Sequence, residues 1–353
     1  MALRRVRITG FRCIASAELA LDPARNCISG ANGAGKTSLL EAIFLLARGR
    51  SFRTRRTGSL LAYGADALTV YGEVDDGPIV RRLGARFAQG HLDKHLDGEV
   101  AKGSTLAEIL PIQSIGPDSH ELIEGGPRGR RRLLDWGVFH VEPSYLEVWQ
   151  RYRRALGQRN MALKKRASPA ALSVWTAALV EAGETIDARR ASYLATLAAT
   201  AREHAHALLG VELALEYRRG WSNGASLEEA LASFDAHDRL SGRTHVGPHR
   251  ADVSILAEGR DVGEVVSRGQ QKLIAAALIL GQETALEGTR SAKGLLLVDD
   301  PAAELDPRAL DRLLDRLARV RGQLILTSID PLRLPSQLTC TRFHVEQGRV
   351  DAL

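Results

Sequence analysis

The sequence predicts an α/β fold in which a core made of two chain segments is interrupted by a mainly helical lobe. Near the start, an apolar strand around Cys27 leads into a glycine-rich turn and then an apolar helical pattern that Gly49 ends. Leu295–Val298 form a continuous apolar run, as strands buried on both faces do. Between these regions, residues 144–166 and 169–209 have the spacing of long helices.

These patterns place the domain boundaries near residues 112 and 246. We expect residues 1–112 and 247–353 to form the α/β lobe, and residues 113–246 to form the inserted helical lobe. Within the insertion, Pro169 suits the first turn of the second long helix. A chain of 353 residues with 44% hydrophobic residues is long enough and apolar enough for two packed lobes.

The glycine-rich turn GANGAGKTS matches the phosphate-binding pattern G-x-x-x-x-G-K-[ST]. Glycines let backbone N–H groups approach phosphate oxygens, and the following helix start adds a positive dipole end. Lys36 would reach the β- and γ-phosphates of ATP, and Thr37 would ligate Mg²⁺. A chance match is the alternative, but the strand–turn–helix context argues against it. The expected ATP-binding residues are Gly30, Ala31, Asn32, Gly33, Ala34, Gly35, Lys36, Thr37 and Ser38.

Two carboxylates follow the apolar strand at 295–298. Asp299 is placed to hold Mg²⁺ through water, and Asp300 is a candidate to orient or deprotonate an attacking water. We therefore expect Lys36, Asp299 and Asp300 to be the catalytic residues, and Thr37 and Asp299 to hold the metal. The alternative is a strand end with two solvated acids.

The string SRGQQK at 267–272 resembles the LSGGQ motif of ABC-type ATPases, with Ser267, Gly269 and Gln270 matching and Arg268 in place of a glycine. An apolar helix follows it. A serine hydroxyl and helix N–H groups suit a γ-phosphate, and the glycine-rich turn already surrounds its own nucleotide. The motif therefore predicts contact with the ATP of a second subunit. An ordinary helix cap by Ser267 is the alternative.

Composition excludes several classes of protein. No stretch of about 18 uncharged apolar residues occurs, which predicts no transmembrane helix. The first 13 residues lack an apolar signal core and have the pattern of a strand. Cys13, Cys27 and Cys340 are far apart and suggest neither a zinc site nor a disulfide framework, so we expect a cytoplasmic protein with reduced thiols.

Positive charge is concentrated in one segment. Residues 128–166 contain eleven Lys or Arg against three acids, whereas the whole chain has a net charge of +6. This is the charge pattern expected for binding a phosphate backbone, and a solvated helix face is the alternative. The candidate DNA-binding residues are Arg128, Arg130, Arg131, Arg132, Arg151 and Arg154.

Several longer strings occur in order along nearly the whole chain: SFRTRRTGSLLAYGA, GGPRGRRRLLDWGVFH, QRNMALKK, THVGPHRADV, SRGQQK and DDPAAELD. Together they resemble the RecF family of bacterial recombination mediator ATPases, which are related to the heads of SMC proteins. The resemblance implies an ABC-type P-loop ATPase head, lobe I, with an inserted helical lobe II.

The resemblance also implies a function. ATP with Mg²⁺ would drive formation of a homodimer that binds single-stranded and duplex DNA at gaps, and slow hydrolysis would release it. The protein would act with RecR and RecO to help load RecA, and would support gap repair, replication restart, recombination and the SOS response. No contact with a membrane is implied.

Two further positions match the family, and one part of the chain departs from the pattern of related ATPases. Gln113 matches the glutamine loop that joins the lobes, and would sense Mg²⁺ or the γ-phosphate. Asp306 matches a loop that crosses the dimer interface, although a helix N-cap before Pro307 is equally consistent. Many ABC ATPases carry a histidine after the next strand, where this chain has Thr327 and Ser328. A hydroxyl can bond a γ-phosphate but carries no positive charge, which favours a slow ATPase.

Two other functions compete with an ATP-gated DNA clamp. The ATPase subunit of a membrane transporter would share the three nucleotide motifs but not the basic helical insertion or the longer strings. A structural platform that uses nucleotide only as a ligand is less consistent with the paired acids. ATP-dependent, salt-sensitive DNA binding would distinguish the clamp from the transporter subunit. A Lys36→Ala variant that still dimerises and binds DNA normally would favour the structural platform.

Overall fold

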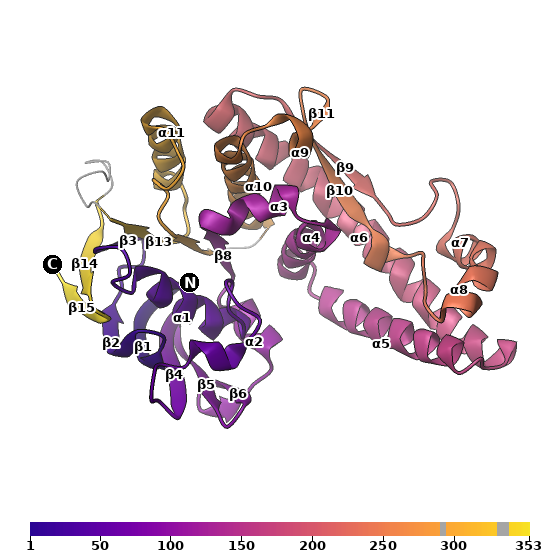
Figure 1. Ribbon diagram of the computed structural model, residues 1–353, viewed down its shortest axis with the longest axis horizontal. Helices are drawn as coiled ribbons and strands as arrows, with labels where there is room; N and C mark the ends of the chain where they lie inside the picture. Colours follow the sequence, from indigo (N-terminus) through magenta and orange to yellow (C-terminus); the bar gives the residue numbers. More distant parts are fainter. Residues whose placement is uncertain (290–293, 330–338) are drawn as a thin grey trace. The chain divides into compact units, whose positions relative to one another are not determined.

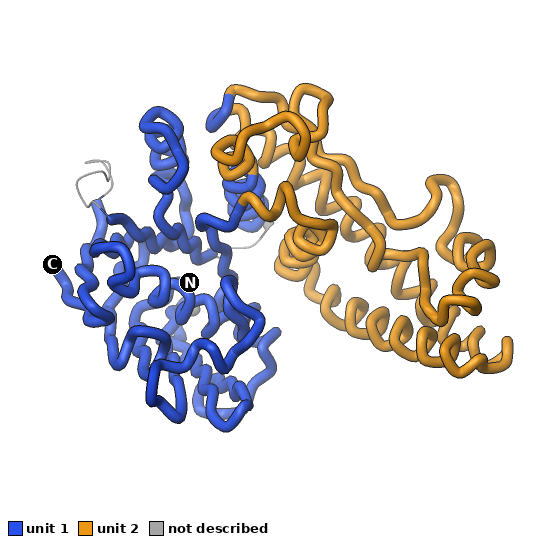
Figure 2. The backbone as a smooth tube through the Cα atoms, viewed as in Figure 1, with its two compact units in different colours: residues 1–119, 207–209, 275–353 blue, residues 120–206, 210–274 orange. Residues whose placement is uncertain are grey.

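The computed structural model describes residues 1–289, 294–329 and 339–353. The chain forms two compact units (Figure 2). Unit 1 comprises residues 1–119, 207–209 and 275–353, and unit 2 comprises residues 120–206 and 210–274. In the described part of the chain, none of the helices combines the length and apolar character needed to cross a membrane.

The first sheet of unit 1 is antiparallel and has the spatial order β2-β1-β4-β5-β6-β7. Burial alternates along β1 and β2, as expected for strands with one face on a core. Its strands are β1 (Ala2–Phe11), β2 (Ile14–Ala20), β4 (Ala67–Asp76), β5 (Ile79–Ala88), β6 (His91–Leu96) and β7 (Glu99–Val100).

The second sheet of unit 1 has the order β15-β14-β3-β13-β12-β8, and its neighbouring strands are parallel except for the pair β14 and β15. Because the strands β3, β12 and β13 are parallel, their carboxyl ends meet at one edge, where ligands bind in such sheets. The strands are β3 (Arg25–Ser29), β8 (Ile112–Ile115), β12 (Leu295–Val298), β13 (Gln323–Ser328), β14 (Thr341–Glu346) and β15 (Arg349–Ala352).

Helix α1 (Lys36–Arg48) lies between the two sheets (Figure 1). It packs against β1, β4 and β5 of the first sheet and β8 and β13 of the second. This position explains why its sequence is apolar on almost every side: Leu39, Leu40, Ile43 and Leu46 are all fully buried. The remaining helical elements among the described residues of unit 1 are η1 (Thr57–Leu60), α2 (Gly103–Ile109), η2 (Pro117–His120, which ends at the unit boundary), the last three residues (207–209) of α6 (Pro169–Leu209), residues 275–289 of α10 (Arg268–Thr289) and α11 (Pro307–Ala318).

Unit 2 is mainly helical, as expected, with a small antiparallel sheet of order β11-β10-β9. Its longest helix begins at Pro169, with Ser168 as N-cap, and ends at Leu209. The elements are α3 (Glu121–Glu124), α4 (Pro127–Val141), α5 (Tyr145–Lys164), α6 (Pro169–Leu209), β9 (Leu213–Arg218), α7 (Leu227–Ser233), α8 (Asp235–Ser241), η3 (Pro248–Arg250), β10 (Asp252–Ala257), β11 (Arg260–Asp261), α9 (Val262–Val265) and the first residues of α10.

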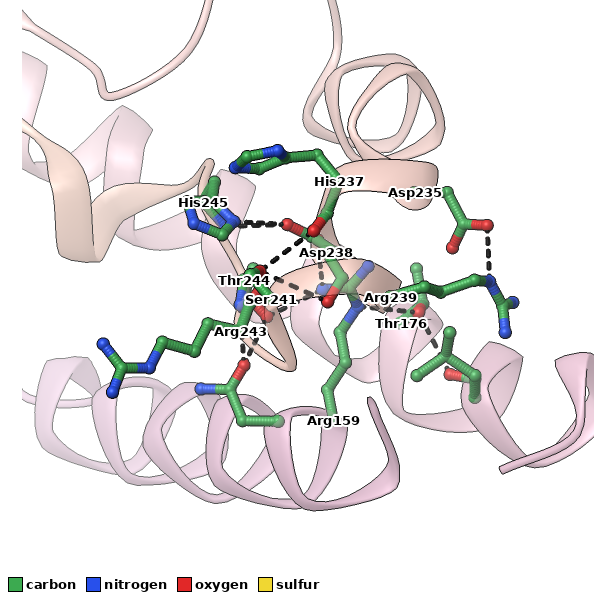
Figure 3. Close-up of polar contacts among 12 residues, drawn as sticks. Arg159, Thr176, Asp235, His237, Asp238, Arg239, Ser241, Arg243, Thr244 and His245 are labelled. Atoms are coloured by element: carbon green, nitrogen blue, oxygen red, sulfur yellow. Dashed lines mark hydrogen bonds and ion pairs between the residues drawn. The ribbon is translucent and has the colours of Figure 1, made fainter. Parts of the chain in front are cut away.

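A buried ion pair joins helices α5 and α8 of unit 2 (Figure 3). Arg159 on α5 is 1% exposed and donates to Asp238 Oδ2 at 2.7 Å, while Asp238 Oδ1 accepts from His245 Nδ1 at 2.9 Å. Arg159 also donates to the hydroxyls of Thr244 and Thr176. A buried guanidinium requires such partners, so this arginine serves the packing of unit 2.

The unit boundaries differ from the expected ones. Residues 113–119 belong to unit 1, because β8 pairs with β12, and residues 247–274 belong to unit 2. The second difference has a physical cause: β10 pairs along its whole length with β9, and Arg130 on α4 binds the carboxylate of Asp252. The expected return to strands after residue 244 is therefore present, but those strands complete the helical unit.

Candidate nucleotide site

The glycine-rich turn lies between β3 and α1, at the carboxyl edge of the parallel sheet in unit 1. Gly33 and Gly35 have φ of 77° and 120°, which favour glycine, and a Cβ at Gly35 would come within 3.1 Å of Cys13 Sγ. A Cβ at Gly30 would overlap the carbonyl oxygen of Val345. Ala31, Asn32 and Gly33 are exposed, so this stretch of backbone is accessible to a ligand.

The glycine-rich turn, residues 30–38, is called the phosphate cradle below. It leaves hydrogen-bond donors available in front of the first turn of α1. Gly35 is the N-cap of α1 and has no side chain to cap it, which leaves N–H groups of the first turn for a ligand. Lys36 Nζ donates to the carbonyl oxygens of Gly30 at 2.7 Å and Ala31 at 2.9 Å. Burial lowers the pKa of Lys36, and the nearby Asp300 and Asp299 carboxylates act against that shift. Ser38 is buried, and its Oγ lies 3.7 Å from Cys13 Sγ.

The first acid after β12 meets the cradle directly. Thr37 Oγ1 lies 3.0 Å from Asp299 Oδ1 and 2.9 Å from Asp299 Oδ2, although the two residues are 262 positions apart in the sequence. Asp299 is 5% exposed, and its backbone N–H donates to Ile115 O on β8. The fold therefore brings a hydroxyl and a carboxylate together, and hard oxygen donors of this kind suit Mg²⁺.

Asp300 and Thr327 complete this edge of the sheet. Asp300 has φ of 43°, in the left-handed region, and its backbone N–H donates to Thr327 Oγ1 at 2.9 Å. Thr327 Oγ1 in turn donates to Asp299 Oδ1 at 2.8 Å. The Thr327 hydroxyl is thus used within the protein, whereas the sequence suggested a contact with a γ-phosphate.

Gln113 lies on β8, beside β12 in the sheet, and its side-chain amide donates to Gln282 Oε1 on α10. Gln282 is fully buried. The contact links a strand next to Asp299 with the helix that begins at the SRGQQK string. Sequence reasoning singled out Gln113 but not its partner, because Gln282 lies in a helical pattern that carries no motif.

A buried acid lies near the middle of helix α1. Glu41 on α1 is fully buried and receives two hydrogen bonds from Arg12, at 3.0 Å from Nε and 2.9 Å from Nη2. Ser51 donates a third hydrogen bond to Glu41. The sequence analysis did not find this cluster. The signal that could have found it is a charged residue inside an otherwise apolar helical stripe.

The SRGQQK string and Asp306 both sit at helix starts. The backbone N–H of Ser267 donates to Gln270 Oε1 at 2.9 Å, and Gln270 N donates to Ser267 Oγ at 3.4 Å, a reciprocal cap. Ser267, Arg268 and Gln270 are exposed. Asp306 is the N-cap of α11 and accepts from the backbone N–H groups of Arg308 and Ala309. Capping roles are thus present at both helix starts.

The six candidate DNA-binding arginines divide into two groups. Arg130 is bound to Asp252 at 2.8 Å and 3.0 Å and to three backbone carbonyls, while Arg131 donates to Ala251 O at 2.7 Å. These two hold α4 against β10, so the geometry does not support the expected DNA contact for them. The exposed members are Arg128 and Arg132 on α4 and Arg151 and Arg154 on α5, of which Arg151 also pairs with Glu181.

Comparison with known proteins decides the family. A family model described as RecF/RecN/SMC N terminal domain matches residues 2–349. The DNA replication and repair protein RecF of Pseudomonas putida strain GB-1 is 40% identical over 362 aligned residues, covering 99% of this chain and 98% of the relative. The chain belongs to the RecF family. The RecF protein of Thioalkalivibrio sulfidiphilus is 41% identical over 354 residues, with the same coverage.

Solved structures agree with this assignment. The structure of the recombination mediator protein RecF-ATP in the RecFOR pathway is similar with a TM-score of 0.87 and 27% identity, covering 100% of this chain and 97% of the other. An Smc head domain from Pyrococcus furiosus shares the fold at a TM-score of 0.62 and 16% identity. The chain therefore has the fold of a RecF or SMC-type ATPase head, and the transporter alternative finds no support.

Proposed function

We propose that this RecF-family chain is an ATP-dependent DNA-binding protein that acts in recombinational gap repair and replication restart. The observation that carries the proposal is the contact of Thr37 with Asp299, which joins the phosphate cradle to the acidic strand end. The relatives, which are named DNA replication and repair proteins, supply the process.

The cradle and the first acid form the cofactor site in this proposal. The exposed backbone from Ala31 to Gly33 and the first turn of α1 bind the phosphates of ATP. Thr37 Oγ1 and Asp299 hold Mg²⁺, which neutralises phosphate charge when bound. In the described residues no cluster of three or more His, Cys, Asp or Glu side chains is placed to hold a metal ion. Mg²⁺ commonly takes one or two protein oxygens together with phosphates and water, which is the donor set that Thr37 and Asp299 would supply with bound ATP.

Two copies form the active species in this proposal. Ser267, Gly269 and Gln270 of one subunit face the nucleotide held by the other subunit, and Asp306 lies at the interface. The exposure of Ser267 and Gln270 supports this role, because a helix start in solvent is accessible to an anion. ATP that touches both subunits has a higher affinity for the closed dimer than for the monomer, as a closing ligand requires.

Hydrolysis is slow and reopens the dimer. Asp300 is the candidate base for the attacking water, and its intermediate exposure permits contact with solvent. At the end of β13 the chain has Thr327, whose hydroxyl is bonded to Asp299 and Asp300, so no charged side chain at that position contacts the γ-phosphate. The protein acts in the cytoplasm with RecO and RecR to help load RecA, and it supports the SOS response.

The DNA surface includes the exposed arginines Arg128, Arg132, Arg151 and Arg154 of unit 2. Contact with the phosphate backbone makes the affinity for DNA fall as salt rises, with little dependence on base sequence. Gapped DNA, which has both single-stranded and duplex parts, is the proposed target.

Sedimentation velocity on gapped duplex DNA tests the proposal. The protein is compared with no nucleotide, with ATP and Mg²⁺, and with ADP and Mg²⁺, at two salt concentrations. We expect a dimer on DNA only in the presence of ATP and Mg²⁺, with a lower affinity for DNA at the higher salt concentration. We expect no such complex for Lys36→Ala. DNA binding that is the same in all three nucleotide states, or absent in all of them, would overturn the proposal.

A further inference from the structure

The hydroxyl of Thr327 joins the two acids of the candidate site. Thr327 is the penultimate residue of β13, is fully buried, and stands in a strand that pairs with both β12 and β3. Its Oγ1 is 2.8 Å from Asp299 Oδ1 and 2.9 Å from Asp300 N. One side-chain atom therefore contacts two consecutive residues at the end of the neighbouring strand.

The chemistry of the partners fixes the direction of both hydrogen bonds. A backbone N–H can only donate, so Thr327 Oγ1 accepts from Asp300. An ionised carboxylate can only accept, so the single hydroxyl proton goes to Asp299 Oδ1. The hydroxyl of Thr327 has no second proton to offer a phosphate oxygen.

These two bonds constrain different features of the site. Asp299 is held between two hydroxyls, that of Thr327 on β13 and that of Thr37 in the cradle. Asp300 occupies a left-handed backbone conformation with φ of 43°, which is unfavourable for a residue with a side chain. A buried acceptor for its N–H stabilises that conformation, and the conformation determines where the Asp300 carboxylate points.

We propose that Thr327 is a positioning residue of the ATPase site, which orients Asp299 toward the metal and Asp300 toward the attacking water. The inference rests on the proposed ATP-dependent function. Because the Thr327 hydroxyl donates its one proton to Asp299, removing the hydroxyl should leave the affinity for nucleotide nearly intact and should lower both the rate of hydrolysis and the affinity for Mg²⁺.

Two matched pairs of variants isolate the hydroxyl from the packing of the strand. Thr327→Val replaces the hydroxyl with a methyl group at nearly constant volume. Thr327→Ser keeps the hydroxyl and loses the methyl group, and Thr327→Ala lacks both, so the Ser and Ala variants differ by the hydroxyl alone. If the Val variant does not fold, the comparison of Ser with Ala carries the test.

The measurements are kcat, KM for ATP, the Mg²⁺ concentration at half-maximal rate, and binding of a fluorescent ATP analogue with and without Mg²⁺. We expect Thr327→Val and Thr327→Ala to lower kcat at least tenfold and to raise the Mg²⁺ requirement at least threefold, with KM changed less than threefold. Thr327→Ser should keep kcat within threefold of the wild type.

Two results would overturn the inference: a wild-type kcat and Mg²⁺ dependence in Thr327→Val, or equal losses in the Ser and Ala variants, which would assign the effect to packing.

The variant Lys36→Ala distinguishes failure of the inference about Thr327 from failure of the proposed function. If the wild type and Lys36→Ala bind and hydrolyse ATP equally, the proposed function fails. If the wild type binds ATP without measurable turnover, the Mg²⁺ dependence of analogue binding decides the role of Thr327.

Discussion

Glu283 provides a sharp test of how the interior of unit 1 responds to pH. It lies on α10, directly after Gln282, and is 3% exposed. Among the residues that the structure describes, its Oε1 has no hydrogen-bond partner. Burial raises the pKa of Glu283 from its ordinary 4.5 to about 8, and the nearby Glu287 carboxylate adds to that shift. The side chain is therefore protonated in the folded protein at neutral pH.

The shift sets both the sign and the size of the effect on stability. Below about pH 4.5 the side chain is protonated in both the folded and the unfolded state, so its titration does not yet reduce the free energy of unfolding. Between 4.5 and about 8 the unfolded state releases the proton and the folded state keeps it, so the free energy of unfolding falls by about 1.4 kcal/mol per pH unit. Above pH 8 both states are ionised and the loss levels off at about 5 kcal/mol.

The assay compares the wild type with Glu283→Gln, which keeps the shape and cannot ionise. Urea unfolding followed by circular dichroism at pH 5.5, 6.5 and 7.5 gives the difference between the two proteins, in which the shared titrations cancel. We expect the wild type to lose about 3 kcal/mol relative to the variant from pH 5.5 to 7.5. A difference that does not change with pH would refute the reasoning.

Three further predictions concern the interface, the DNA surface and the packing of unit 2. Ser267→Arg should leave ATP binding by the monomer intact and should block the ATP-dependent dimer in sedimentation. Ser267→Ala, which loses only the helix cap, should lower the free energy of unfolding by about 1 kcal/mol. A normal ATP-dependent dimer in Ser267→Arg would contradict the interface role. Arg154→Ala should reduce the slope of log affinity for duplex DNA against log salt concentration by about 0.9. Arg130→Ala, in contrast, should lower thermal stability. Equal slopes in Arg154→Ala and the wild type would show that Arg154 is not part of the DNA surface. Arg159→Met should lower the free energy of urea unfolding by about 3–5 kcal/mol, because Asp238 stays buried without its cation; a loss under 1 kcal/mol would contradict this account of the ion pair.

Local patterns predicted most secondary structure well, because each depends on neighbours in the sequence. The helix expected from Pro169 to Leu209 has those bounds, and the strand Leu295–Val298 is buried along its whole length. Gly49 ends α1 in a left-handed conformation, as its position after the apolar pattern indicated. Periodicity and turn chemistry are properties of a few adjacent residues, so the sequence shows them directly.

Charge was a weaker guide, since it does not show which cations face solvent. The basic segment suggested one continuous DNA surface. In the structure, Arg130 and Arg131 hold α4 against β10, and Arg159 is buried against Asp238. Their partners lie 122, 120 and 79 residues away in the sequence, and nothing near an arginine reveals a distant acceptor.

What the sequence by itself determined is the chemistry that this chain carries: the glycine cradle with Lys36 and Thr37, the paired acids Asp299 and Asp300, and the alternation of strands and helices. What only the tertiary structure decided is which of these groups meet. The parallel order of β3, β13 and β12 puts the carboxyl ends of distant strands at one edge, and there Thr37 contacts Asp299 and Thr327 bridges both acids. Hydrogen bonds act over about 3 Å, so residues far apart in sequence bond only after the sheet has aligned them.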